Sequence, residues 1–539
     1  MRAHLATVVA LALFCGCTRQ GTHSQAAGRH PWTIPHVLRM AELAQPDNLN
    51  PYLSQMDVSY EVTSLVYSYL IVADAHGRLI GDLATQVPTV ANGGISRDGL
   101  TYVYHLRHTV RWQDGLPFTA ADVAASWRAV IAPKNLTIYR QGYDRVTSIA
   151  TPDRYTVVVH LRHRYPPFVS QFFAPLQEGG KPILPAHVLD RTDFNRGDLS
   201  QRAIGTGPFR LVAFKRGDEM VFERNDNYFR GRPKLERIEL HFAADVQTML
   251  TLARTHAIDF IVTPVPELLD QYRTIDGYTT RLVPWNQQGM IVVNGGKPGL
   301  GDPAVRRAIS LAIDRAQITS KITRGAYDLP HDAIATTAVG YVHRPSPRYD
   351  PARANAILDR DGWRRGADGV REKDGARLEY TIATISGSGI FVEIPLLVQQ
   401  QLRAIGVHLT VKAYSNNQIF DFSGPLDTYR YDLAIYGSAL SWDPDSHAYF
   451  GCDQWFPKGQ NFYRYCNREY DALEAAGLSS DDPRVRAPVY ARADAILWNT
   501  AAYLPLFQRR RILVYNSDLR NYEPNSTSTP WWNAWQWDI

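Results

Sequence analysis

Residues 205–238 read GTGPFRLVAFKRGDEMVFERNDNYFRGRPKLERI and are the most informative segment of the chain. Gly205 and Gly207 stand before Pro208, a pattern typical of a tight backbone passage, because glycine accepts positive φ and proline fixes its own φ. Apolar and polar residues alternate on both sides of a turn at residues 216–218, which predicts two strands flanking that turn. At no workable spacing does the stretch combine a nucleophile, a general base or metal ligands into a catalytic or metal site.

Length and charge narrow the class of protein. A chain of 539 residues exceeds what one hydrophobic core usually serves, so we expect two or three lobes. The net charge is only +5 and the basic residues are scattered. We find no basic face interleaved with aromatic residues, so nucleic acid is not an expected partner. The longest basic run, residues 509–511, is interpreted as a solvated strand edge or as an ion pair between lobes.

The N-terminal residues predict export. Arg2 precedes an apolar run, residues 5–14, that is too short to span a bilayer. A small residue then precedes Cys17, which resembles a lipoprotein signal with a lipid on the Cys17 thiol. Cys15 offers a competing site, and an ordinary secreted protein is the alternative. Residues 18–36 have the composition of a tether, and no later run of 18 apolar residues occurs.

The two remaining cysteines, Cys452 and Cys466, predict a disulfide. In an oxidising compartment that bond closes a short loop, with an entropy contribution of about 3 kcal/mol. Two free or separately buried thiols are the alternative. A metal site is disfavoured because a second pair of ligands is missing, and no cofactor is expected.

Local patterns predict a small N-terminal subdomain. Residues 102–106 alternate as a strand, Thr119 begins a helix with Asp122 as the partner in a capping box, and a strand pair surrounds residues 152–153. From residue 235 onward, strands and helices alternate, which predicts an α/β lobe of parallel strands with helices on both faces. The expected helices lie at 246–254, from 302 onward, and at 394–405.

The loop at residues 437–446 follows a predicted strand at 431–436 and is the expected binding loop. It combines an aromatic platform, Trp442, with two carboxylates, Asp443 and Asp445. A turn in which the carboxylates bond their own backbone is the alternative. Calcium ligation is disfavoured because other oxygen ligands are missing. Glycosidase chemistry is disfavoured because aspartates two residues apart do not flank a sugar.

Several motifs in order resemble one family. The stretch at 205–238 is similar to the GTGP…RN…Y…G.P.L..I signature of solute-binding lipoproteins that serve peptide-importing ABC transporters. Further matching motifs are LNP at 49–51, DLA at 82–84, the DGLTY to DV segment at 98–123, DPAVRRAI to AIDR at 302–315, and YDP with GW at 349–363. The resemblance implies a binding protein and not an enzyme.

The resemblance also implies an architecture. We expect an α/β, two-lobed fold of the periplasmic binding-protein type, with a hinge and an extra N-terminal subdomain. The two hinge crossings are placed near 285–294 and 502–515. The expected division is signal 1–17, tether 18–36, lobe I at 37–66, 205–285 and 508–539, the extra subdomain at 67–204, and lobe II at 286–507.

The substrate is less well defined. Dipeptide-binding members place an aspartate for the peptide ammonium where this chain has Leu440. They also place an arginine in the loop that here spans 384–389 and contains none. An unpaired buried ammonium is costly, which argues against a strict dipeptide specialist. The other candidate contact residues are Ser438, Ser386, Asn50 and Trp285.

The sequence therefore predicts a monomeric, lipid-anchored receptor on the periplasmic or outer face of the cell membrane. It would capture oligopeptides or related small polar solutes by lobe closure and deliver them to ABC permease subunits. Binding of an oligosaccharide, opine or metal chelate is the alternative within the family. An extracytoplasmic hydrolase, or a sensory receptor on the same fold, is the alternative outside it.

Overall fold

The structure is a computed structural model that describes residues 28–539, except 55, 138–139, 176–179, 198, 200–201, 388, 422 and 528–529. Cys17, Cys15 and the expected signal segment lie outside the described residues. Within the described part of the chain, no helix is long and apolar enough to cross a membrane.

One ten-stranded mixed sheet runs through both lobes in the order β16-β15-β17-β11-β18-β10-β1-β9-β8-β7. Lobe I contributes β1 (Val37–Glu42), β7 (Phe209–Lys215), β8 (Glu219–Arg224), β9 (Arg237–Phe242) and β10 (Phe260–Ile261). Lobe II contributes β15 (Glu379–Ile385), β16 (His408–Tyr414) and β17 (Leu433–Ala439). The predicted parallel pairing holds for β1 with β9 and β10, and for β15 with β16 and β17.

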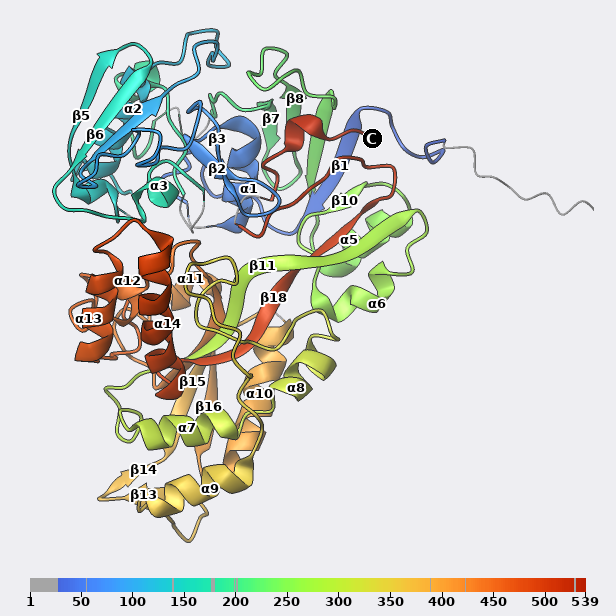
Figure 1. The fold of residues 1–539 in the computed structure, drawn as a ribbon. Coiled ribbons are helices and arrows are strands. Elements are labelled where there is room, and N and C mark those ends of the chain that lie inside the picture. Colours follow the sequence, from blue (N-terminus) through green and yellow to red (C-terminus); the bar gives the residue numbers. More distant parts are fainter. Residues whose placement is uncertain are drawn as a thin grey trace, which may run out of the picture.

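Two long antiparallel strands join the lobes, β11 (Tyr278–Val293) and β18 (Leu504–Asn516). In Figure 1 they run side by side from the upper half of the molecule to the lower half. β10 pairs with the C-terminal end of β18, whereas β17 pairs with the C-terminal half of β11. Both strands overlap the residues where the hinge crossings are expected, 285–294 and 502–515, and β11 begins several residues before the first of these ranges.

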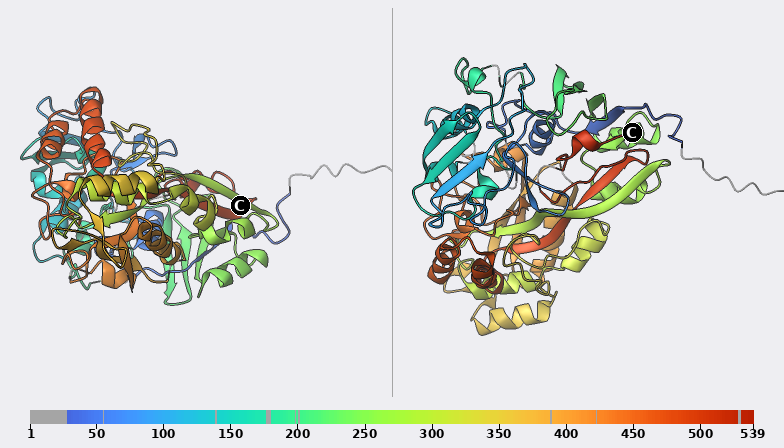
Figure 2. Two further views of the ribbon diagram at one scale, coloured as in Figure 1. Left: turned by 90° about the horizontal axis from the view of Figure 1, so that it is seen from below. Right: turned by 45° about the horizontal axis from the view of Figure 1, so that its top comes forward.

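The extra subdomain packs beside lobe I as a separate layer (Figures 1 and 2). It holds a three-stranded sheet, β4 (Thr101–His105), β6 (Thr156–Leu161) and β5 (Val146–Asp153), and the pair β2 (Ile71–Ala73) and β3 (Leu79–Gly81). Its helices are α2 (Ala120–Ile131), α3 (Phe168–Gln171) and α4 (Ala186–Leu189). The predicted capping box begins α2, where the Thr119 backbone N–H donates to the Asp122 carboxylate at 2.8 Å.

The remaining helices cover the two lobes. Lobe I carries α1 (Asp57–Val66), α5 (Val246–Arg254) and α6 (Leu269–Tyr272). Lobe II carries α7 (Pro303–Leu311), α8 (Arg315–Gln317), α9 (Pro351–Arg360), α10 (Gly389–Arg403), α11 (Asn416–Ile419), α12 (His447–Phe450), α13 (Arg468–Gly477), α14 (Pro483–Asn499) and the small strands β12 (Arg364–Arg365), β13 (Arg371–Lys373) and β14 (Ala376–Arg377).

The two glycines of the GTGP motif are needed for close packing, not for positive φ. Neither has a positive φ. A Cβ atom on Gly205 would lie 1.8 Å from the Val66 carbonyl oxygen, and one on Gly207 would lie 2.6 Å from that of Leu65. The Gly207 N–H donates to the Val66 carbonyl at 2.8 Å. The motif therefore fixes the C-terminal end of α1 against the chain that leads into β7.

Gly205→Ala is expected to lower the free energy of unfolding by at least about 2 kcal/mol, because the methyl group would overlap rigid backbone. Gly437→Ala is the matched control, since its Cβ would meet no atom closer than 3.7 Å. Chemical denaturation of both variants measures the difference. Equal stability of the two variants would contradict the close-packing role of the motif.

Candidate ligand-binding site

A cavity of about 80 Å³ lies between the lobes at the two long strands and is partly open to solvent. α1 and residues 262–264 line it from lobe I, and Tyr327 and Leu440 line it from lobe II. The hinge contributes residues 285–287 of β11 and 509–512 of β18. Both lobes and both crossings therefore share one wall, as expected of a site that responds to lobe movement.

A bulge in β11 shapes this wall. Pro284 pairs with Arg510, and the next pair is Gln288 with Gln508, so residues 285–287 stand opposite Arg509 alone. Such a bulge leaves backbone groups without ladder partners. The Gln508 side chain satisfies two of them, because its amide N–H₂ donates to the carbonyls of residues 285 and 287 at 2.6 and 2.9 Å.

The bulge directs Trp285 into the cavity, where two guanidinium groups contact its ring. The Cζ atoms of Arg509 and Arg511 lie 4.7 and 4.3 Å from its ring centroid. Arg509 also donates to the Gln287 side-chain oxygen at 2.5 Å and to the Tyr327 hydroxyl at 3.3 Å. Trp285 was expected as a contact residue and it lines the cavity.

The arginine run at 509–511 was not expected at the binding site, but all three residues line the cavity. Arg510 pairs with Asp328 of lobe II at 2.6 Å, which agrees with the interpretation as an ion pair. The other interpretation, a solvated strand edge, is wrong because β18 lies in the interior of the sheet. The sequence of the run did not indicate a site. These arginines line the cavity next to a bulge in β11, and such a bulge leaves no clear pattern in the sequence.

The lobe I wall is acidic. Glu61 pairs with Arg511 through one oxygen at 3.3 Å, and its other oxygen is buried without a hydrogen-bond partner among the residues that the structure describes. Burial raises the pKa of Glu61 well above its usual value, against the attraction of Arg511. Burial likewise raises the pKa of Glu42 to about 7.

Asp57 begins α1 and lines the cavity. Its side chain is exposed, yet the surrounding protein displaces enough water to raise its pKa, against the attraction of Arg509 and Arg511. Within the described part of the chain, the Asp57 side chain forms no hydrogen bond or ion pair.

The expected binding loop is shorter than the sequence indicated, because Gly437 and Ser438 still belong to β17. Leu440 lines the cavity, whereas Trp442 lies outside the cavity lining. The Trp442 ring packs against the lobe I core, and its indole N–H donates to the Gly77 carbonyl of the extra subdomain at 3.2 Å. Trp442 therefore connects the two lobes.

The carboxylates of this loop have protein partners. Both oxygens of Asp443 accept from the Arg486 guanidinium of α14 at 2.8 Å, and the pair is buried. Asp445 accepts a hydrogen bond from the Tyr165 hydroxyl of the extra subdomain at 3.4 Å. The Asp445 N–H donates to Asp443 at 3.0 Å, which is the self-bonding turn considered as the alternative. Neither carboxylate lines the cavity.

Three further candidates also lie outside the cavity lining. Asn50 is fully buried and donates to the Phe194 carbonyl at 2.9 Å. Ser386 is exposed beyond β15, and Ser438 pairs with Gln288 within the sheet. The structure joins Cys452 to Cys466 by a disulfide, which closes the segment after the loop. Among the described residues no group of three or more His, Cys, Asp or Glu side chains could hold a metal ion.

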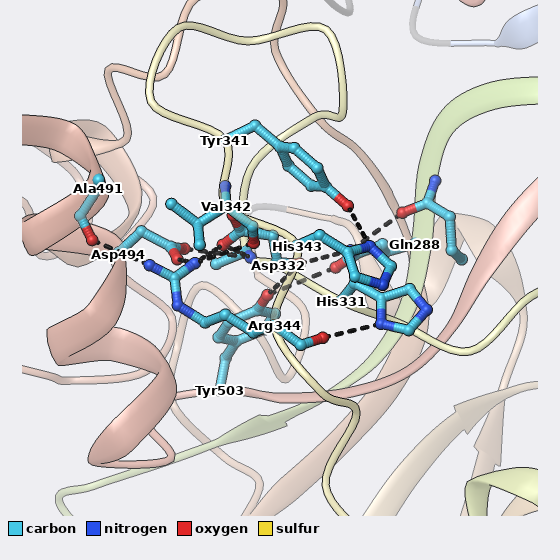
Figure 3. Close-up of polar contacts among 12 residues, drawn as sticks. Gln288, His331, Asp332, Tyr341, Val342, His343, Arg344, Ala491, Asp494 and Tyr503 are labelled. Carbon is cyan, nitrogen blue, oxygen red and sulfur yellow. Dashed lines mark hydrogen bonds and ion pairs between the residues drawn. The ribbon is translucent and has the colours of Figure 1, made fainter. Parts of the chain in front are cut away.

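A buried polar network anchors lobe II to the hinge (Figure 3). The Arg344 guanidinium contacts two buried carboxylates, Asp332 at 2.6 Å and Asp494 of α14. The Gln288 side-chain amide and the Tyr503 hydroxyl donate to the Asp332 backbone carbonyl at 2.7 and 3.1 Å. Burial and the neighbouring Asp332 carboxylate raise the pKa of Asp494 to about 9, so this carboxyl carries a proton at neutral pH.

Comparison with known proteins identifies the class. Residues 79–460 match the model of the bacterial extracellular solute-binding proteins, family 5, which is most of the chain. The chain belongs to this family. It is therefore a two-lobed solute-binding protein with a mixed α/β fold.

Particular relatives span nearly the same length. Protein XP55 of Streptomyces lividans is 28% identical, with 83% of this chain and 79% of that protein covered. The oligopeptide-binding protein AppA of Bacillus subtilis is 23% identical over 96% and 95% of the two chains. NikZ from Campylobacter jejuni, solved in complex with Ni(L-His), has a TM-score of 0.81 at 25% identity, covering 94% of this chain and 100% of NikZ.

The Asp494 carboxyl predicts a pH dependence. An aspartate in an unfolded chain loses its proton near pH 4, whereas folded Asp494 keeps it to about pH 9. The folded state thus binds an extra proton in this window, so its stability falls as pH rises from about 4 to about 9. The stability of the Asp494→Asn variant is expected to fall less than that of the wild type over this pH range.

Thermal unfolding midpoints measured between pH 5 and pH 9 test this expectation. Asp226→Asn is the control, because Arg232 and Arg224 lower the pKa of that exposed carboxyl, which therefore titrates below the window. Parallel profiles for the wild type and Asp494→Asn would show that the network does not hold a proton.

Proposed function

We propose that this chain is the receptor of an ABC importer, that it captures oligopeptides or related small polar solutes by lobe closure, and that it delivers them to the membrane permease. The observation that carries the proposal is the cavity that α1, the hinge bulge and the end of β17 line together. AppA from Bacillus subtilis, solved in complex with a nonapeptide, has a TM-score of 0.80 and supports a peptide ligand.

Contacts between the lobes support closure. The indole of Trp442 in lobe II donates to Gly77 of the extra subdomain. Arg164 of the extra subdomain pairs with Asp481 of lobe II at 2.9 Å, and both side chains are partly exposed. Such small, partly polar contacts contribute little individually, so a ligand bound to both lobes could decide the balance between open and closed forms.

A metal chelate is the second candidate ligand, because NikZ was solved in complex with Ni(L-His). The cavity offers an aromatic platform and guanidinium groups to such an anionic or zwitterionic complex. Its lining contains no histidine or cysteine among the described residues, so the protein would hold the chelate through the chelating molecule and not through the metal.

We propose binding without catalysis. Among the described residues, the cavity lining offers carboxylates, guanidinium groups and hydroxyls but no cysteine or histidine. The Thr263 hydroxyl donates to Glu42 at 2.8 Å, but the same Glu42 oxygen also accepts the backbone N–H groups of residues 43 and 44, at 2.7 and 3.2 Å. That oxygen is thus a structural acceptor and not a free general base for a nucleophile. Release of product from peptides by the purified protein alone would contradict this part of the proposal.

We also propose export and a lipid anchor on Cys17, with the protein acting as a monomer at the outer face of the cell membrane. The support is the apolar run at 5–14 followed by Cys17 in the sequence. Mass spectrometry of the N-terminal peptide from membrane-derived protein tests the anchor, and an unmodified Cys17 would contradict it.

Trp285→Ala is expected to weaken peptide binding at least about tenfold, because an aromatic anchor contributes on the order of 2 kcal/mol or more at a binding site. Trp455→Ala is the control, since Trp455 is exposed and lies outside the cavity lining. Native mass spectrometry with a mixture of random-sequence peptides measures retention. Equal loss in both variants, or no loss in either, would contradict the proposed site.

A further inference from the structure

We infer that the cavity selects zwitterionic solutes, with the cationic end of the solute at Asp57 and Glu61 and the anionic end at Arg509. This inference rests on the proposed function, because it concerns the ligand of the same cavity. It depends on which charges in the cavity have protein partners and which do not.

Most of the charged groups in the cavity lining are paired. Arg510 pairs with Asp328, and Arg511 pairs with one oxygen of Glu61. Two groups remain: the Asp57 carboxylate and the Arg509 guanidinium, neither of which forms an ion pair within the described part of the chain. They attract each other across the cavity but form no ion pair with one another. One free charge of each sign therefore faces the same space.

Two carboxyl groups of α1 line the cavity, the exposed Asp57 and the buried Glu61. Asp57 and Glu61 are four residues apart, so they lie on the same face of the helix, where two like charges destabilise each other. Glu61 is 5% exposed, and one of its oxygens is buried without a partner among the described residues. A solute ammonium bound to the exposed Asp57 carboxylate would relieve this repulsion.

Arg509 is oriented for an anion. Trp285 and Tyr327 contact its guanidinium faces at 4.7 and 5.5 Å from their centroids, and its terminal nitrogens donate to Gln287 and to the Tyr327 hydroxyl. These contacts hold the guanidinium in place. Within the described ranges, no carboxylate pairs with its charge and its buried Nε has no partner. A guanidinium fixed in this way loses little entropy on binding a carboxylate.

The two subsites together disfavour singly charged solutes. A cation would leave Arg509 unmatched inside the closed cavity, and an anion would leave Asp57 unmatched. An unmatched charge that loses its water on lobe closure lowers the affinity for the solute. The cavity is therefore selective because it binds singly charged solutes weakly. A peptide of uncharged residues with both termini free meets both requirements.

The test uses the mature protein freed of retained ligand and pools of random tri- to pentapeptides built from uncharged residues. The pools have free termini, acetylated N-termini or amidated C-termini, and native mass spectrometry measures competition between them. The wild type is expected to prefer the free pool at least about tenfold over either blocked pool. Asp57→Asn is expected to lose the discrimination against acetylation, and Arg509→Gln the discrimination against amidation.

Glu236→Gln and Arg484→Gln change the same charges on exposed surfaces and are expected to keep both preferences. Because Asp57 lies in the first turn of α1, where the helix dipole stabilises a carboxylate, melting temperatures are measured in parallel. A lower melting temperature with unchanged selectivity would assign Asp57 a structural role and overturn the inference. Equal retention of free and blocked peptides by the wild type would overturn the inference but leave the peptide function intact. Retention of no peptide would overturn both.

Discussion

The pairing of β11 with β18 holds the two lobes together and shapes the cavity between them. These strands connect the lobes, and their ladder is interrupted where residues 285–287 bulge opposite Arg509. Gln508 compensates the interruption by donating to two carbonyls of the bulge. Without those hydrogen bonds the buried carbonyls would lose their partners, at a cost of about 1–3 kcal/mol each. The same irregularity places Trp285 and Arg509 in the cavity.

The site and the hinge therefore share residues. Gln288 follows the bulge and is bonded to the Asp332 carbonyl of the lobe II network, while α1 in lobe I is held against the GTGP segment. The contacts of a solute that touches both α1 and β18 would depend directly on how these two elements are positioned relative to each other. This arrangement provides a physical route from solute binding to lobe position, because differential contacts in two conformations are what shift an equilibrium.

Local sequence patterns predicted much of the fold and less of the site. The capping box of α2, the α5 and α7 helices and the β7–β8 hairpin depend on neighbouring residues, so they were found. The roles of Asp443 and Arg509 depend on partners far along the chain. Asp443 lies in the expected binding loop, yet it pairs with Arg486. Arg509 belongs to a basic run with no predicted binding role, yet it lines the cavity. A bulge and a long-range ion pair leave no periodic signal.

Small-angle X-ray scattering tests lobe closure around the hinge cavity most directly. The protein is unfolded in guanidinium to remove retained ligand, refolded with its disulfide intact, and measured with and without the random peptide pool. We expect a smaller radius of gyration when peptide is bound, and no such change in Trp285→Ala at the same peptide concentration. An unchanged radius of gyration in wild-type protein that demonstrably holds peptide would contradict lobe closure.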